Sequence, residues 1–140
     1  MKCLIYIAII SVLSLVTGCR QKRVDQSSPY LRTFEASQPG LESGKPDTLK
    51  MGTMREGEKV TMEFLLRNGF DEPLVIEKVV SGCGCALFGY SRKPVAPGES
   101  AAMEVTFNSA GFYGEIIKES KIYTSACKKP YRIIIEAVVK

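Results

Sequence analysis

Hydrophobic side chains recur at every second position along the part of the chain that follows Asp47, and this alternation constrains the fold more than any other feature. It is plainest near the end of the chain, where Tyr131, Ile133 and Ile135 are spaced two apart in a run rich in β-branched residues. A period of two is that of a β-strand with one buried face, whereas an α-helix repeats every 3.6 residues. No window shows the repeat of a long amphipathic helix, so we expect an all-β fold.

Turn-forming residues separate the expected strands, and Asn68-Gly69 is a strong signal of this kind. The clearest strands are expected at 61–67, 74–77, 103–108, 116–124 and 131–139. The charges of Lys118, Glu119 and Lys121 give the fourth of these the look of an exposed edge strand. Six or seven short strands between residues 47 and 140 are the signature of an immunoglobulin-like β-sandwich.

The composition excludes several functional classes. The chain has no histidine, so it cannot form a Ser-His-Asp triad, a Cys-His pair or an HExxH zinc site. Its 19 basic and 15 acidic residues give a net charge of only +4, without a dense basic run, so nucleic acid is not expected as a partner. We therefore predict that the protein is not an enzyme.

The first 19 residues have the form of an export signal that ends in a modified cysteine. Lys2 gives a positive start, and the thirteen residues from Leu4 to Val16 are almost wholly apolar. That length suits a signal peptide and falls short of the roughly 20 residues that a spanning helix needs. Residues 15–19 resemble a bacterial lipobox, in which the cysteine receives a diacylglyceryl group before cleavage. We predict a lipoprotein signal peptide at 1–18 and a lipid on Cys19; the alternatives are an uncleaved anchor helix or a cut elsewhere.

A lipid on Cys19 would anchor the chain to a membrane of the bacterial cell envelope. Each buried methylene of the acyl chains contributes about 0.8 kcal/mol to membrane binding. Arg20 does not resemble the Asp signal that retains lipoproteins in the inner membrane, so we expect the outer membrane, with the protein facing the periplasm. Apart from this covalent lipid, no cofactor is expected.

Residues 19–46 are predicted to be the lipidated N-terminus and a flexible linker, because the segment is rich in Ser, Gln, Gly and Pro. A strand docked through Tyr30 to Phe34 is the less favoured alternative. The sandwich domain is then expected at 47–140.

Three cysteines of the expected domain, Cys83, Cys85 and Cys127, form the one group with distinctive chemistry. In an extended strand the Cα atoms of Cys83 and Cys85 lie about 6.6 Å apart, near the upper limit for a disulfide, and Gly84 could bend to close the gap. A bridge from either cysteine to Cys127 would close a loop of roughly 43 residues, worth about 4 kcal/mol. Three thiolates could also hold copper(I), or a CxC pair could act as a redox couple. We favour a structural disulfide or buried thiols over a metal site.

The domain also resembles a known bacterial family, family 1573 of the domains of unknown function, over about Leu49 to Val139. The matching motifs, in order, are Met51-Gly52-Thr53, Gly57-Glu58, Phe64–Gly69, Pro73–Ile76, Ser81-Gly82-Cys83-Gly84-Cys85, Pro97-Gly98-Glu99, Val105–Phe107 and Gly111-Phe112. The resemblance implies an immunoglobulin-like module akin to Hydin-type domains, with no established activity. Ala86 and Ala137 depart from the family's usual residues, and Cys127 lies outside its pattern.

Other candidate residues are less distinctive. The carboxylates of Glu56, Glu58, Asp71, Glu72 and Glu119 are expected to be solvated charges. Leu87, Phe88 and Tyr90 either form an exposed apolar patch that marks a partner site or fill the sandwich. The prediction from sequence is a membrane-anchored lipoprotein that acts as a non-catalytic binding or scaffolding module for an unknown envelope protein or glycan. The alternative is a soft-metal (copper) or thiol-redox protein acting through Cys83, Cys85 and Cys127.

Overall fold

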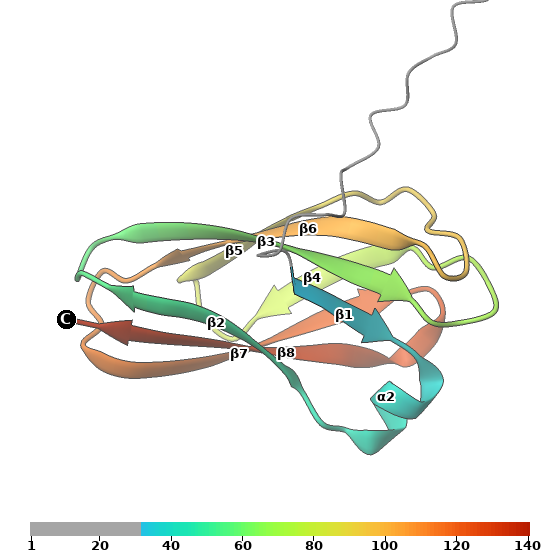
Figure 1. Ribbon diagram of the computed structural model, residues 1–140, viewed down its shortest axis with the longest axis horizontal. Coiled ribbons are helices and arrows are strands. Elements are labelled where there is room, and N and C mark those ends of the chain that lie inside the picture. The colour runs from blue at the N-terminus through green and yellow to red at the C-terminus, as the bar shows by residue number, and fades with distance from the viewer. Residues whose placement is uncertain (1–31) are drawn as a thin grey trace, which may run out of the picture.

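The computed structural model describes residues 32–140 (Figure 1). The predicted signal peptide at 1–18, the lipidated Cys19 and the first part of the predicted linker lie outside the described residues. Within residues 32–140, no helix has the length and apolar character needed to cross a membrane.

The described chain is built almost wholly from strands, as the alternation predicts. Its elements, in order, are β1 (Arg32–Ala36), α2 (Gln38–Ser43), β2 (Asp47–Met54), β3 (Lys59–Asn68), β4 (Ile76–Ser81), β5 (Ala86–Tyr90), β6 (Ser100–Asn108), β7 (Gly114–Thr124) and β8 (Cys127–Val139). Seven strands, β2 to β8, lie within residues 47–140, where six or seven were expected, and β1 precedes them. The all-β prediction is confirmed.

The strands form two four-stranded sheets that lie face to face, which confirms the predicted β-sandwich (Figure 1). One sheet has the order β1-β3-β6-β5 and the other has the order β2-β8-β7-β4. Both sheets are mixed, because β1 runs parallel to β3 and β2 runs parallel to β8, while the other pairs are antiparallel. The core lies between the sheets.

Strand β8 shows how the alternation produces this core. Tyr131, Ile133, Ile135, Ala137 and Val139 are buried, and each residue between them is only half-buried on the outer face. Phe64 and Phe107 of the opposite sheet are fully buried against this row. Burial of one large aliphatic or aromatic side chain contributes about 1.5–3 kcal/mol, so these rows supply much of the domain's stability.

Strand β7 is an edge over only half of its length, whereas the whole of 116–124 was predicted to look like one. Strand β4 pairs with β7 from Ser120 to Thr124 and leaves the first half of β7 uncovered on that side. In the uncovered half, Lys118 lies in the same alternation as the buried residue Ile116, and its ammonium group lies 4.9 Å from the centre of the Phe112 ring. A charge on the inner side of an edge strand is a known protection against unwanted pairing.

The predicted linker of 19–46 does not extend through residues 32–46, which are folded onto the sandwich. Strand β1 pairs with β3, and the ring of Phe34 is buried with its centre 5.7 Å from that of Phe64. Helix α2 buries Leu41 and ends at Gly44, whose left-handed backbone (φ 64°) suits glycine. The polar residues of this segment occupy mainly exposed positions, while the buried side chains of Phe34 and Leu41 hold the segment against the sandwich. The domain therefore begins at or before Arg32, and the predicted start at Asp47 was too late.

Candidate functional site

The Cys-Gly-Cys segment forms the crossover between the two sheets. On one side, the Gly82 N–H donates a hydrogen bond to the Glu119 carbonyl oxygen of β7 (3.0 Å). On the other side, the Cys85 carbonyl oxygen accepts a hydrogen bond from the Asn108 N–H of β6 (2.8 Å). The chain thus leaves β4 in one sheet and enters β5 in the other within four residues.

Cys83 and Cys85 are bonded to each other within this crossover. Their Cα atoms are 5.2 Å apart, shorter than the spacing of an extended strand, because the backbone bends at residues 82–85. Both side chains are half-buried and pack against the core. Of the pairings considered from the sequence, the structure has the local one, in a position that favours a structural role.

Cys127 is a free, half-buried cysteine at the start of β8. It lies near the beginning of β4, whereas the Cys-Gly-Cys crossover follows the end of β4. Cys127 pairs with Thr124, which lies opposite Ile76 at the start of β4, whereas Cys83 follows the end of that strand. A six-residue strand is roughly 20 Å long, so the three sulfur atoms predicted as an alternative metal site are not brought together. Across residues 32–140, no group of three or more Cys, Asp or Glu side chains is placed to hold a metal ion.

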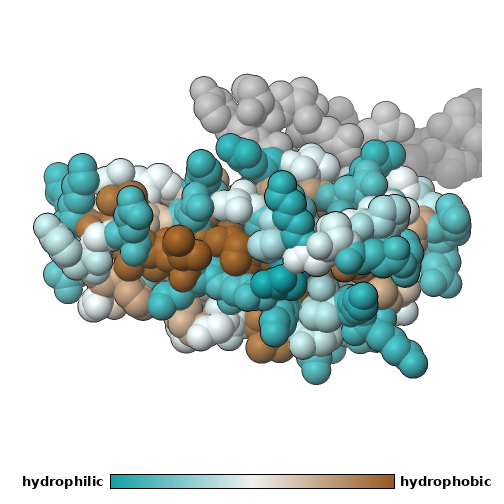
Figure 2. Space-filling model, turned by 90° about the horizontal axis from the view of Figure 1, so that it is seen from below, coloured by the Kyte–Doolittle hydropathy of each residue, from teal (hydrophilic) through white to brown (hydrophobic). Residues whose placement is uncertain are grey.

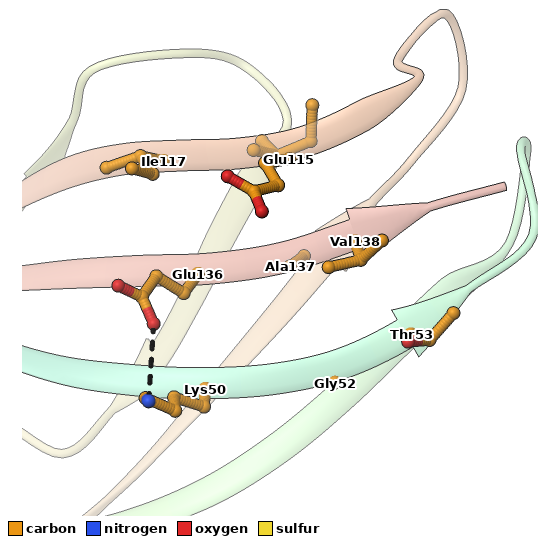
Figure 3. Close-up of a pocket in the computed structure, with 9 residues that line it drawn as sticks. Lys50, Gly52, Thr53, Glu115, Ile117, Glu136, Ala137 and Val138 are labelled. Atoms are coloured by element: carbon orange, nitrogen blue, oxygen red, sulfur yellow. Dashed lines mark ion pairs between the residues drawn. The ribbon is translucent and has the colours of Figure 1, made fainter.

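A concave site, here called the outer hollow, lies on the exposed face of the β2-β8-β7-β4 sheet (Figure 3). Its volume is about 300 Å³, and three adjacent strands line it. The lining residues are Lys50, Gly52 and Thr53 of β2, Glu136, Ala137 and Val138 of β8, and Glu115, Ile116 and Ile117 of β7.

A bulge in β2 creates this hollow. The pairing of β2 with β8 shifts between Lys50 and Gly52, so that Met51 is an extra residue whose side chain is buried in the core. Gly52 has a left-handed backbone (φ 79°), and a Cβ placed there would meet no atom within 4 Å. Because Gly52 has no side chain, space is left above the sheet, beside Val138.

The outer hollow joins apolar and acidic surface. The large aliphatic side chain of Ile117 lies on the outer face of β7 and is 65% exposed. In Figure 2, which shows the molecule from below, hydrophobic surface gathers in the middle of the face and hydrophilic side chains surround it. Glu136 pairs with Lys50 (3.8 Å), as drawn in Figure 3, while Glu115 forms no ion pair within the described part of the chain.

Arg132 and Glu119, two further charged residues of this sheet, are held in structural contacts. The Arg132 Nε donates to the Glu119 carboxylate (2.6 Å), and the Arg132 Nη1 donates to the carbonyl oxygen of Gly44, after α2 (2.9 Å). The hydrogen bond from Arg132 lowers the pKa of Glu119, so this carboxylate is a weak base. On the inner side, burial and the hydrogen bond to Asp47 raise the pKa of Tyr131. These groups fix the N-terminal segment to β8.

The predicted apolar group at 87–90 is divided by the structure. Phe88 and Tyr90 pack against the core, whereas Leu87 is 70% exposed on the opposite face of β5. The outer hollow was not predicted from the sequence. The signals that could have indicated it are Gly52, which lies within β2, and Ile117, which lies among the charges of 115–121.

Comparison with models of known protein families identifies one that matches this chain. A model described as "Protein of unknown function (DUF1573)" matches residues 43–139. The chain belongs to the DUF1573 family. The match includes the Cys-Gly-Cys crossover and all the residues of the outer hollow. No curated protein matches the chain.

Several solved structures share the fold of this DUF1573 chain. A protein of unknown function from Porphyromonas gingivalis W83 is 20% identical with a TM-score of 0.57, and the match covers 66% of this chain and 44% of that one. The VesB protease of Vibrio cholerae is 17% identical with a TM-score of 0.53, and the match covers 66% of this chain and 30% of that one. This chain therefore spans less than half the length of these proteins. Likeness at such identities shows the fold alone.

Proposed function

We propose that this DUF1573 protein is a lipid-anchored, non-catalytic binding module of the cell envelope that recognises its partner through the outer hollow. The observation that carries the proposal is the exposed Ile117, which lines the same concave surface as Gly52 at the bulge of β2. A concave apolar surface with a few polar groups at its rim is the usual form of a binding site.

The chemistry of the outer hollow favours a protein partner over a glycan. Val138 and Ile117 offer apolar contact, and Glu115 offers a carboxylate that is not engaged by a cation of the described chain. A partner that places an aliphatic or aromatic side chain next to a lysine or arginine would satisfy both features. A non-catalytic role is supported by the lack of histidine and by the ion-paired state of Glu119.

The anchor in this proposal is the lipid predicted on Cys19, and the location is the periplasmic face of the outer membrane. The alternative of a copper site loses its support, because Cys83 and Cys85 are bonded to each other and Cys127 lies apart from them. A redox role for the Cys83–Cys85 pair alone has no specific observation in its favour.

Site-specific photocrosslinking in cells tests the proposed interface. A photoreactive amino acid replaces Ile117 in one full-length variant and Thr61 of β3 in a matched control, since both side chains are exposed and lie on different sheets. We expect the probe at 117 to crosslink to a defined protein segment that contains an apolar residue beside a basic one. Ile117→Lys, combined with a probe at Thr53, should abolish the crosslink. Equal crosslinking from positions 117 and 61, or a crosslink that survives Ile117→Lys, would contradict the proposal.

A further inference from the structure

Among the strand edges that no other strand of residues 32–140 covers, the edge formed by β5 is the one without a charged residue. Charged residues protect the other free edges: Arg32 and Glu35 on β1, Asp47 and Lys50 on β2, Glu77 and Lys78 on β4, and Glu115 and Lys118 on the uncovered half of β7. The pairing of β2 and of β4 is also interrupted by a register shift, whereas β5 pairs regularly with β6. Charges and bulges are two of the means by which sheet edges avoid pairing with another chain, and β5 has neither.

The backbone of β5 presents a row of hydrogen-bonding groups to this free edge. Cys85 accepts a hydrogen bond from Asn108 of β6, which fixes the alternation of the antiparallel pair. Residues 85, 87 and 89 therefore direct their N–H and C=O groups toward β6. Ala86, Phe88 and Tyr90 direct theirs away from β6, to the open side of the strand.

The side chains of β5 alternate in size as well as in direction. On the core side, Ala86 is small, while Phe88 and Tyr90 are large. On the outer side, Leu87 is 70% exposed and Gly89 has no side chain. The strand thus presents one small and one large residue, two positions apart, on its outer face.

We propose that β5 pairs with β5 of a second copy of this chain, antiparallel and centred on Phe88, so that two four-stranded sheets become one sheet of eight strands. In this register the outward-facing backbone groups meet: Phe88 lies opposite Phe88, and Ala86 lies opposite Tyr90. Each of these three pairs exchanges two hydrogen bonds, which gives six in all.

The proposed register is self-complementary on both faces. Leu87 of each copy lies opposite Gly89 of the other on the outer face, and Tyr90 lies opposite Ala86 on the core side, so every large residue except Phe88 faces a small one. Symmetric registers centred on any other residue of β5 bring fewer of these outward-facing groups together and allow fewer hydrogen bonds. Because the strand is uncharged, bringing two copies together creates no repulsion along it. This symmetry, which an unrelated peptide would not share, favours a second copy as the occupant.

Sedimentation of the full chain in density-matched detergent tests the proposed pairing. We expect the mass of two copies for the parent chain. Leu87→Lys should reduce it to one copy, because two lysines would lie beside the shared edge of the uncharged strands. Ile117→Lys is the matched control, since its side chain is 65% exposed on the other sheet, and it should leave the mass of two copies unchanged. Circular dichroism spectra that match the parent show that each variant is folded.

A disulfide trap tests the register itself. In a background with Cys127→Ser, the double variant Leu87→Cys, Gly89→Cys should form a covalent dimer under oxidising conditions. Either single variant should not, because two copies of the same position lie diagonally, about 7–8 Å apart, beyond the reach of a disulfide. A Cβ at position 89 meets only the Glu104 side chain, at an ordinary 3.6 Å, so the substitution is tolerated.

A parent chain that sediments as one copy, a Leu87→Lys variant that still sediments as two, or a double variant that forms no covalent dimer would each overturn the pairing. These outcomes do not depend on the proposed partner interface, because Ile117 and the outer hollow belong to the other sheet.

Discussion

Gly82 is held where β4 leaves its sheet, and its lack of a side chain is a steric requirement. A Cβ at position 82 would lie 2.9 Å from the carbonyl oxygen of Glu119, which is backbone and cannot move aside without breaking the crossover. We expect Gly82→Ala to destabilise the domain by about 1–3 kcal/mol, as overpacking typically does. Gly84→Ala is the matched control, because a Cβ there meets nothing within 4 Å.

Urea unfolding of the two glycine variants measures this difference as a shift in midpoint at constant slope. The Gly84→Ala midpoint should stay close to the parent value. Equal midpoints for the two variants would show that the crossover tolerates a side chain at position 82.

Tyr131 makes the stability of the domain depend on pH in the alkaline range. Burial, and then the hydrogen bond to the Asp47 carboxylate, raise the pKa of Tyr131 above its ordinary value of 10.0. Since the folded state holds this proton more tightly than the unfolded state, the stabilisation is complete below about pH 10 and is lost as the pH rises above that value. Tyr131→Phe cannot ionise and should lose less stability than the parent between about pH 8 and about pH 11. Chemical unfolding of both proteins at the two pH values checks this, and parallel losses would contradict it.

At the scale of elements, β1 is the part of the domain that a boundary at Asp47 would remove. The buried ring of Phe34 packs edge-on against Phe64, so Phe34→Ala should cost about 3–5 kcal/mol in the free energy of unfolding. Arg32→Ala, on the exposed side of the same strand, should change it by less than about 0.5 kcal/mol. Denaturant titration of both variants measures the two values. A small effect of Phe34→Ala would mean that β1 contributes little to the fold.

The elements also show which parts of the structure could be predicted from the sequence. Strands β3, β6 and β8 are long and half-buried, so their alternation revealed both their type and their inner face. Strand β1 has only two inward apolar residues, Phe34 and Ala36, and its parallel partner lies about 30 residues away, so no local pattern marks it. The outer hollow depends on a register shift between β2 and β8, which is a property of the pairing and of neither strand alone.

At the scale of the whole molecule, the proposed function requires that the domain be attached to a membrane. We expect an alkyne-tagged fatty acid, supplied to growing cells, to label the full chain, and Cys19→Ala to abolish the label because the acyl-accepting thiol is lost. Cys127→Ser is the matched control and should be labelled like the parent. The readout is in-gel fluorescence of the purified chain after coupling to a dye. Label retained in Cys19→Ala would contradict the predicted anchor.

The parallel pairing of β2 with β8 also determines when the domain can fold during its synthesis. Asp47 pairs with Ile133, 86 positions later in the chain, and β2 borders no other strand of its sheet. Strand β2 can therefore pair only after β8 has been made, and contacts so distant in sequence make folding slow. A nascent chain that lacks β8 cannot bury Leu49 or Met54 in their native positions. Such a chain cannot complete the β2-β8-β7-β4 sheet, and an incomplete domain is what passage through a narrow channel, as the predicted signal peptide implies, requires.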